Sequence, residues 1–493
     1  MNGIAAVALA DFRQRSRTFR TLLVVAVALQ LGYLFVPDAH AAYTVVNLGG
    51  WRGVYDSNWM GAATALLTVT LFPLFGFFLI RPATSRDAAL GTFEVTAAAP
   101  LSRVAVVLGK WLSDVAFLSA IAGVMVVAAA AMQFVRGESR AFDPIAYLLP
   151  FALVTVPACG VTATAAILFS AIPGLRGIGG GIAWIFAFAG LLTWPILGTQ
   201  GITFVGLDPF GMTTITSALF ASLQAHAGHV AVAHDVEIGF EPVPSALKTF
   251  VFGGIPWSVQ SVAYRVGWTV VPAALCVLAA PWALRSSLPA ARGRGFRVAR
   301  LVDAVPLPAL LRAELAQGLG LAGPWWLLGA VALGLAAAVA PAEAVARAFA
   351  PPAWVWALGP IAALGVSDAR AGIDAVLLAA PTPAWRRLVA RWLAAFVLSA
   401  LPVVGLALHP GSLVLLAVAA GLAACAVAAG TLARSAIAFE TASLVLWYLG
   451  PVNRVPGLDP AGFTRSPGTT ALIVAGVSIA SLAAASMRAS RRG

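Results

Sequence analysis

Long apolar stretches alternate with short polar segments along the chain, and this alternation predicts membrane-spanning helices. A helix needs about 20 consecutive apolar residues to cross a bilayer, and the chain contains about twelve stretches of roughly that length. They lie near 20–37, 58–80, 104–134, 146–171, 177–199, 261–284, 321–340, 352–366, 386–408, 411–432, 435–452 and 469–487. The pattern predicts an all-α, polytopic membrane protein with about 12 transmembrane helices.

Similar sequences recur in the first and second parts of the chain, which indicates an internal duplication. Residues 87–112 and 368–393 are identical at nine of 26 positions without a gap. The other two repeats pair 10–14 with 313–317 and 206–213 with 457–464. We therefore expect two homologous six-helix halves, because membrane proteins that move a substrate are often built from repeats. The expected domains are a first half at 1–285, a basic cytoplasmic linker at 286–312, and a second, trimmed half at 313–493.

Composition and charge narrow the class of protein. The chain is 60% hydrophobic and 10% charged with a mean hydropathy of +0.91, which excludes a soluble globular protein. The net charge of +12 could indicate nucleic acid binding, but the Lys and Arg residues lie between the apolar stretches. Alternating topology from a cytoplasmic N-terminus places about 23 of the 31 Lys and Arg residues on the inner side. We expect both termini in the cytoplasm, a lipid bilayer around the helices, and no nucleic acid partner.

One of the repeats places an Asp-Pro pair after the fifth apolar stretch of each half. The pairs are Asp208 with Pro209 and Asp459 with Pro460. An Asp that precedes a helix accepts backbone N–H bonds, and a Pro fits the first helical turn. We expect each pair to form a turn that starts a short outer helix, and a part in an outer gate is the alternative.

The sequence contains no motif for catalysis or nucleotide binding. The phosphate-binding pattern G-x-x-x-x-G-K-[ST] is absent, and no apolar stretch carries the paired carboxylates of a proton relay. We therefore expect no enzyme activity and no cofactor in this chain. The three cysteines lie within apolar stretches and are expected to be small core residues.

The duplicated segment after the second apolar stretch of each half has the features of a hinge. In the first half, Gly91 interrupts a helical run, Pro100 ends it, and Asp87 and Glu94 carry negative charge. This predicts a short helix parallel to the membrane, on which a cytosolic motor could push; an ordinary interfacial loop is the alternative. The corresponding residues of the second half are Asp368, Gly372, Asp374 and Pro381.

Three motifs lie in and after the first hinge: Arg86-Asp87-x-x-x-Gly91-Thr92-x-Glu94, Pro100-Leu-Ser-Arg103 and Gly109-Lys110-Trp111. Together they resemble the coupling region of type 2 ABC exporter permeases. The resemblance covers the first half and reaches the second half through the internal repeat alone. There the motif is eroded, because Ile373 replaces Thr92 and Ala375 replaces Glu94.

This resemblance implies a permease subunit of an ATP-driven ABC transporter of the exporter class. It implies a separately encoded ATPase partner, in two copies, that binds ATP and magnesium. The fused halves then imply one copy of this chain for each pair of ATPase subunits. The resemblance also implies the bacterial plasma membrane as the location.

A second hypothesis is an ion-coupled secondary transporter of twelve spans. The motif Asp368-x-Arg370-x-Gly372 resembles the loop between the second and third spans of the major facilitator class. The missing ion-coupling carboxylates and the better match of the first hinge favour the ABC permease.

A third hypothesis is a membrane enzyme or a metal site on the outer side. His226, His229 and His234 lie in a long outer segment, and imidazoles at this spacing can bind copper or zinc. No nucleophile or acid–base pair accompanies them. We expect a solvated outer loop without a metal.

Overall fold

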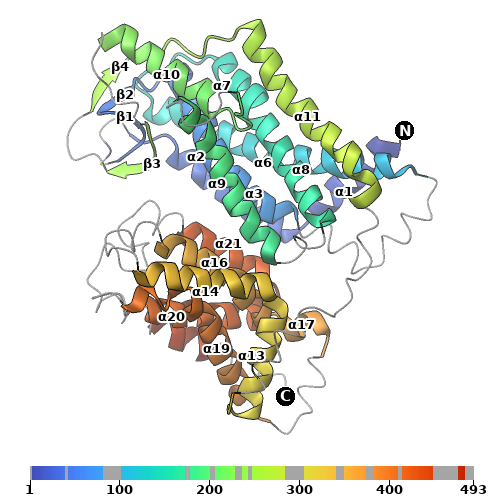
Figure 1. Cartoon of the computed structure of the whole chain (residues 1–493). Coiled ribbons are helices and arrows are strands. Elements are labelled where there is room, and N and C mark those ends of the chain that lie inside the picture. Colours follow the sequence, from blue (N-terminus) through green and yellow to red (C-terminus); the bar gives the residue numbers. More distant parts are fainter. Residues whose placement is uncertain are drawn as a thin grey trace. The chain divides into compact units, whose positions relative to one another are not determined.

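The structure is a computed structural model in which most of the described residues are helical (Figure 1). The described residues are 3–38, 41, 43–81, 101–172, 175, 178–199, 206–227, 236–242, 247–283, 302, 305–339, 349–373, 382–408, 414–447, 473 and 476–483. The chain divides into two compact units, each described by itself below. Unit 1 comprises residues 1–176 and 183–289, and unit 2 comprises 177–182 and 290–493.

Unit 1 is a helical bundle with a small region of strands. Its helices are α1 (Gly3–Ser16), α2 (Phe19–Leu34), α3 (Ser57–Ile80), α6 (Arg103–Arg136), α7 (Pro144–Pro150), the π-helix η1 (Phe151–Thr155), α8 (Val156–Ala171), α9 (Ile178–Thr199), α10 (Met212–Ala227) and α11 (Val259–Ala283). The first residues of α9, 178–182, are counted with unit 2. Its strands are β1 (Tyr43–Leu48), β2 (Trp51–Gly53), β3 (Val236–Pro242) and β4 (Lys248–Phe250).

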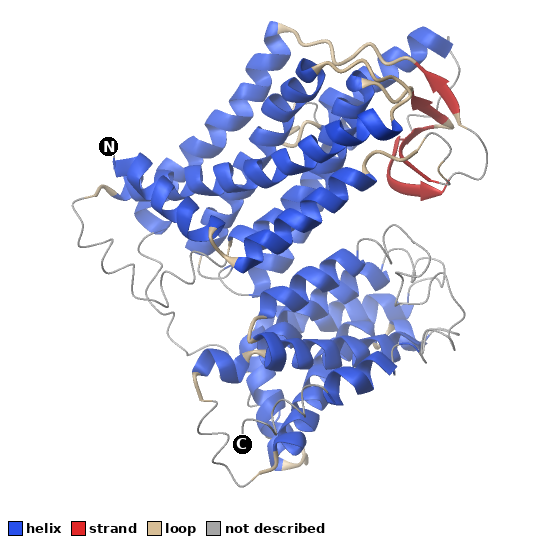
Figure 2. Cartoon of the chain, turned by 180° about the vertical axis from the view of Figure 1, so that it is seen from behind, coloured by secondary structure: helices blue, strands red, loops and turns tan. Residues whose placement is uncertain are grey.

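Unit 2 is helical throughout its described residues. Its elements are α13 (Ala309–Ala322), α14 (Pro324–Val339), α16 (Ala350–Gly365), α17 (Ser367–Ala371), α19 (Ala384–Ala400), the 3-10 turns η6 (Leu401–Val403) and η7 (Leu406–Leu408), α20 (Val414–Ala433) and α21 (Ala436–Trp447). A helical stretch at 476–483 follows near the end of the chain. Figure 2 shows that helices dominate both units.

Several helices are long and apolar enough to cross a membrane. Within the described residues five helices meet this criterion, and two bent helix pairs raise the number to seven if each pair is one span. These residues confirm a mostly helical protein with spanning helices, but the predicted layout of about twelve spans is larger than this number. Predicted spans such as 352–366 form shorter helices, and most of 469–487 lies outside the described residues.

The four strands depart from the all-α prediction. β1 pairs with β3 in antiparallel orientation, with Val46 opposite Ile238, and β2 pairs with β4 in parallel orientation. The strands are three to seven residues long, so they are too short to produce a strong periodic signal in the sequence. Their partners lie almost 200 residues away, which no local pattern can indicate.

Polar residues at the helix starts explain where two of the long helices begin. The Asp56 carboxylate accepts a hydrogen bond from the Trp59 backbone N–H at 2.9 Å and caps α3. The Ser102 hydroxyl accepts one from the Ala105 N–H at 3.1 Å and caps α6. Both caps satisfy N–H groups that the first helical turn leaves without a partner.

The same packing scheme recurs in the two units. Each begins with a helix that bends sharply into the next, by 80° between Gly3–Ser16 and Thr21–Leu34 and by 96° between Ala309–Ala322 and Trp326–Val339. In unit 1, α6 packs against α1, α3 and α8; in unit 2, α19 packs against α13, α16 and α20. The sequence repeat therefore corresponds to a repeat of helix packing, with α6 and α19 in equivalent places.

Candidate functional site

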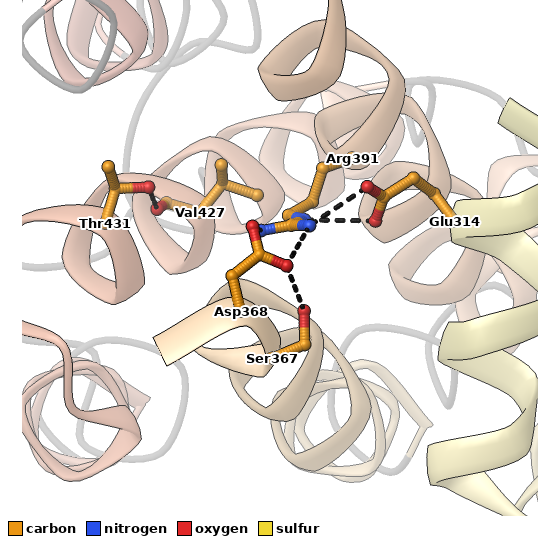
Figure 3. A network of polar contacts seen from close by, with 6 residues as sticks. All are labelled: Glu314, Ser367, Asp368, Arg391, Val427 and Thr431. Atoms are coloured by element: carbon orange, nitrogen blue, oxygen red, sulfur yellow. Dashed lines mark hydrogen bonds and ion pairs between the residues drawn. The ribbon is translucent and has the colours of Figure 1, made fainter. Parts of the chain in front are cut away.

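A buried arginine joins three elements of unit 2. Figure 3 shows Arg391 of α19 between Glu314 of α13 and Asp368 of α17. The Arg391 guanidinium donates from Nε and Nη2 to the two Glu314 carboxylate oxygens, both at 3.0 Å. It also donates from Nη1 and Nη2 to the two Asp368 oxygens at 2.7 and 2.8 Å. Both pairs are bidentate, which is the geometry in which arginine binds carboxylates most strongly.

Close helix packing holds the segment that carries Asp368. At the end of α16, a Cβ on Gly365 would lie 2.4 Å from the Ala426 carbonyl oxygen of α20. A Cβ on Gly430 would lie 2.1 Å from the Gly365 carbonyl oxygen, so the two helix backbones are in direct contact there. Gly372 then ends α17 in the left-handed conformation, with φ of +67°. The packing therefore brings Asp368 beside Arg391.

The charge of the unit 2 network is not balanced by its arginine alone. One guanidinium meets two carboxylates, and the side chains of Arg391 and Glu314 are each only 8% exposed. The Asp368 side chain is 24% exposed, so water can still reach it. Removing a partner from a buried pair leaves an uncompensated charge. The Arg391–Glu314 pair is thus the buried anchor, and Asp368 is its contact with the surface.

Unit 1 carries a related network at the contact of α1 with α6. Arg15 forms ion pairs with Asp11, at 2.6 Å within α1, and with Asp114 of α6. The Ser113 hydroxyl donates to the Asp11 carboxylate at 2.7 Å. Burial by itself lowers the pKa of the Arg15 guanidinium, but the carboxylates of Asp114 and Asp11 raise that pKa above its ordinary value. Arg15 therefore stays charged within this buried contact.

The two networks lie at corresponding helix contacts, but their arginine comes from a different helix in each unit. Asp11 and Glu314 occupy matching positions of the sequence repeat. The cation is Arg15 on the first helix of unit 1, but it is Arg391 on α19, the equivalent of α6, in unit 2. Gly318 takes the place of Arg15 in the repeat, and a Cβ there would lie 2.6 Å from Leu398. In both contacts the first helix supplies a buried carboxylate, while the arginine lies on that same helix in unit 1 and on the facing helix in unit 2.

The Asp-Pro pair of the first half lies shortly before the helix α10. The Asp208 carboxylate accepts hydrogen bonds from the backbone N–H groups of Met212 and Thr213, both at 2.9 Å, at the start of α10. Pro209 is placed differently from the prediction. It lies in a turn before α10, in which the Gly211 N–H donates to the Asp208 carbonyl, and not in the first helical turn. Asp459 and Pro460 lie outside the described residues.

The first hinge also lies outside the described residues. This applies to Arg86, Asp87, Gly91, Thr92, Glu94 and Pro100, and to Asp374 and Pro381 of the second hinge. Of the predicted coupling residues, Asp368 and Gly372 are described, and they bound the short helix α17. The segment between Gly372 and Pro381, where the second hinge helix is predicted, lies outside the described residues from 374 to 381.

Of the three histidines predicted as candidate metal ligands, the structure describes His226. His226, at the end of α10, packs its ring against Trp51 and Phe250, with centroid distances of 6.0 and 6.4 Å. His229 and His234 lie outside the described residues. Among the residues that the structure describes, no group of three or more His, Cys, Asp or Glu side chains could hold a metal ion.

No sequence motif pointed to Arg15, Asp114 or Arg391 as site residues. A charged side chain within an apolar helix is itself a signal, because such residues need a buried partner. The signal does not name that partner, however: Arg391 and Glu314 are 77 residues apart, and Arg15 and Asp114 are 99 apart.

Comparison with known proteins gives no match for the chain: no protein family model, no curated protein and no solved structure matches it.

Proposed function

We propose that the chain is the permease subunit of an ATP-driven ABC transporter of the exporter class. In this proposal two six-span halves form one chain of twelve spans in the bacterial plasma membrane, with both termini in the cytoplasm. A separate ATPase, in two copies, binds ATP and magnesium. The proposal is supported by the motifs of the first hinge and by the repeat of helix packing in the two units.

The observation that carries the proposal is the position of Arg391. Its guanidinium ties Asp368, at the start of the second hinge, to α19 and to α13. Because a guanidinium is planar and both of its pairs are bidentate, the three elements cannot shift independently without breaking hydrogen bonds. A displacement of the hinge would therefore move the helices. Such a linkage is what a transporter needs between an external motor and its spans.

A specific observation favours the alternative, an ion-coupled secondary transporter. Asp114 is a buried carboxylate in the long apolar helix α6. Intramembrane carboxylates often mark ion pathways. Asp114 already forms an ion pair with Arg15, however, and an ion-binding carboxylate would have to be free of such a cation. We therefore keep the ABC permease as the leading function.

Copurification with an ATPase tests the proposal. The chain is expressed with its genomic neighbours, purified in detergent, and assayed for a stoichiometric ATPase. We expect the ATPase to copurify with the wild type and to be lost with Glu94→Arg, which reverses charge in the first hinge. Asp368→Asn should retain the ATPase, because Arg391 keeps Glu314, but should weaken the stimulation of ATP hydrolysis by the permease.

Glu237→Arg is the matched control for charge reversal. Glu237 lies in β3, where its carboxylate accepts a hydrogen bond from Asn47, far in sequence from either hinge. We expect this variant to retain the ATPase. If no ATPase copurifies under any condition, the proposal fails and the secondary transporter becomes the leading account. If the Glu94→Arg variant retains the ATPase to the same extent as the wild type, the first hinge is not the contact with the ATPase.

A further inference from the structure

Arg265 of α11 is a completely buried cation that binds backbone carbonyls. Its exposed fraction is 0%. The guanidinium donates from Nε to the Leu153 carbonyl oxygen at 2.9 Å, from Nη1 to that of Asp208 at 2.6 Å, and from Nη2 to that of Pro209 at 3.3 Å. Within the described residues it forms no ion pair with a carboxylate. One side chain thus connects α11, the turn before α10 and the π-helix η1.

The carbonyl of Leu153 cannot accept the usual hydrogen bond of an α-helix. In a regular α-helix it would accept from the residue four positions later, but that residue is Pro157, which has no N–H. The chain is π-helical from Phe151 to Thr155, and Arg265 Nε reaches Leu153. A π-helical turn within an α-helix is a frequent feature of functional sites and of bends. Arg265 therefore binds the backbone where the helical hydrogen-bond pattern between α7 and α8 is irregular.

The turn before α10 is held by two neighbouring residues of α11. The Tyr264 hydroxyl donates to the Gly206 carbonyl at 2.6 Å and accepts from the Asp208 N–H at 2.9 Å. Arg265 binds the carbonyls of Asp208 and Pro209 in the same turn. The Asp208 carboxylate does not contact Arg265 in this way; it accepts hydrogen bonds from backbone N–H groups at the start of α10. The turn is consequently fixed to α11 by hydrogen bonds to backbone oxygens, which water can replace when the turn moves.

We propose that Arg265 is the positioning residue of an outer gate formed by the turn at 206–211 and α10. While Arg265 holds the turn against α11 and η1, the gate is closed. When the turn moves away, water takes over the freed carbonyls, and η1 accommodates the change in the neighbouring helix. This inference deepens the transport function proposed above and rests on it, because the gate would control access to the transport pathway.

The test measures how fast a buried position of α10 reacts with a water-soluble maleimide. Ile215 has an exposed fraction of 0% and serves as the reporter through Ile215→Cys, in a chain whose native Cys159, Cys276 and Cys425 are replaced by alanine. The chain is reconstituted in nanodiscs, where both membrane faces are open to the reagent. We expect Arg265→Lys to accelerate labelling about tenfold. The three carbonyls are bound by three different nitrogens of the planar guanidinium, and the single nitrogen of an ammonium group does not reproduce that spread of donors.

Two controls separate a gate from a general loss of structure. Leu66 of α3 is also fully buried, and a Leu66→Cys reporter should remain unlabelled in Arg265→Lys. Arg52→Lys makes the same substitution at an arginine that pairs with Glu138 instead, and it should leave labelling of the Ile215→Cys reporter unchanged. Tyr264→Phe removes one hydroxyl from the same turn and should give a smaller acceleration than Arg265→Lys.

Two results would overturn the inference. In the first, Arg265→Lys leaves labelling of the Ile215→Cys reporter at the wild-type rate. In the second, it accelerates labelling of both reporters equally, which shows a structural role alone. The measurement needs no ATPase, so it is independent of the copurification test. If the labelling test supports the gate but no ATPase copurifies, the ABC permease proposal fails and the gate remains. If an ATPase copurifies but the labelling test fails, the permease proposal remains and the gate is rejected.

Discussion

Trp111 and Trp392 make the same contact in the two units, although they are 281 positions apart in the sequence. The Trp111 indole N–H, on α6, donates to the Gly160 carbonyl of α8 at 3.2 Å and to the Thr164 hydroxyl at 2.9 Å. The Trp392 indole, on α19, donates to the Ala420 carbonyl of α20 at 3.0 Å. The repeat therefore extends from sequence identity to an equivalent interhelical hydrogen bond.

Replacing each tryptophan by phenylalanine tests whether these bonds contribute equally. Trp111→Phe and Trp392→Phe keep most of the aromatic packing and remove the N–H donor. We expect each to lower the free energy of unfolding by about 1 kcal/mol, the usual size of an interhelical hydrogen bond in a membrane protein. Unfolding in mixed micelles measures this. Equal losses would support equivalent roles, and a loss in one half alone would contradict them.

Arg391→Ala should be among the most destabilising single changes in unit 2. It leaves the Glu314 and Asp368 carboxylates together without their cation, and we expect a loss of about 3–5 kcal/mol. A double-mutant cycle should give Glu314 a larger coupling energy to Arg391 than Asp368, because the Glu314 side chain is 8% exposed and that of Asp368 is 24% exposed. Equal coupling energies would show that the burial of the carboxylate does not determine the relative strength of the two ion pairs.

In unit 1, Arg15→Ala should be more destabilising than Asp114→Ala. Arg15→Ala leaves two carboxylates, Asp11 and Asp114, close to each other in a buried contact. After Asp114→Ala, by contrast, Arg15 keeps its ion pair with Asp11. The order of the two thermal unfolding midpoints, measured in one detergent, checks this. The opposite order would mean that Asp11 does not stabilise Arg15 when Asp114 is absent.

The crossing of α16 with α20 should not tolerate a methyl group. In Gly430→Ala the new Cβ would lie 2.1 Å from the Gly365 carbonyl oxygen, so the helices must separate. We expect a loss of about 1–3 kcal/mol, as for other overpacked contacts. Gly476→Ala is the matched control, since its Cβ would meet no atom within 4 Å. It should be neutral or slightly stabilising, because alanine favours helix more than glycine does.

The fold could be predicted from the sequence where the signal was local. The apolar runs at 58–80 and 104–134 predicted the long helices α3 and α6, because the length of an apolar run is a property of adjacent residues. The hydrogen bonds of Asp208 to the start of α10 agree with the expected turn for the same reason, since a cap acts within a few residues. The four strands could not be predicted, because β1 and β3 pair across a long separation.

The sequence by itself determined that this is a mostly helical protein with several helices long and apolar enough to span a membrane. Tertiary structure alone decided which charges meet. Arg391 and Glu314 lie 77 residues apart, and Arg265 reaches a carbonyl 112 positions before it. A buried charge must find a partner, but which partner it finds depends on how the helices pack, and that is set by the shapes of side chains from the whole unit. The sequence thus specifies which helices carry charged residues, and the packing of the helices specifies which groups those residues bind.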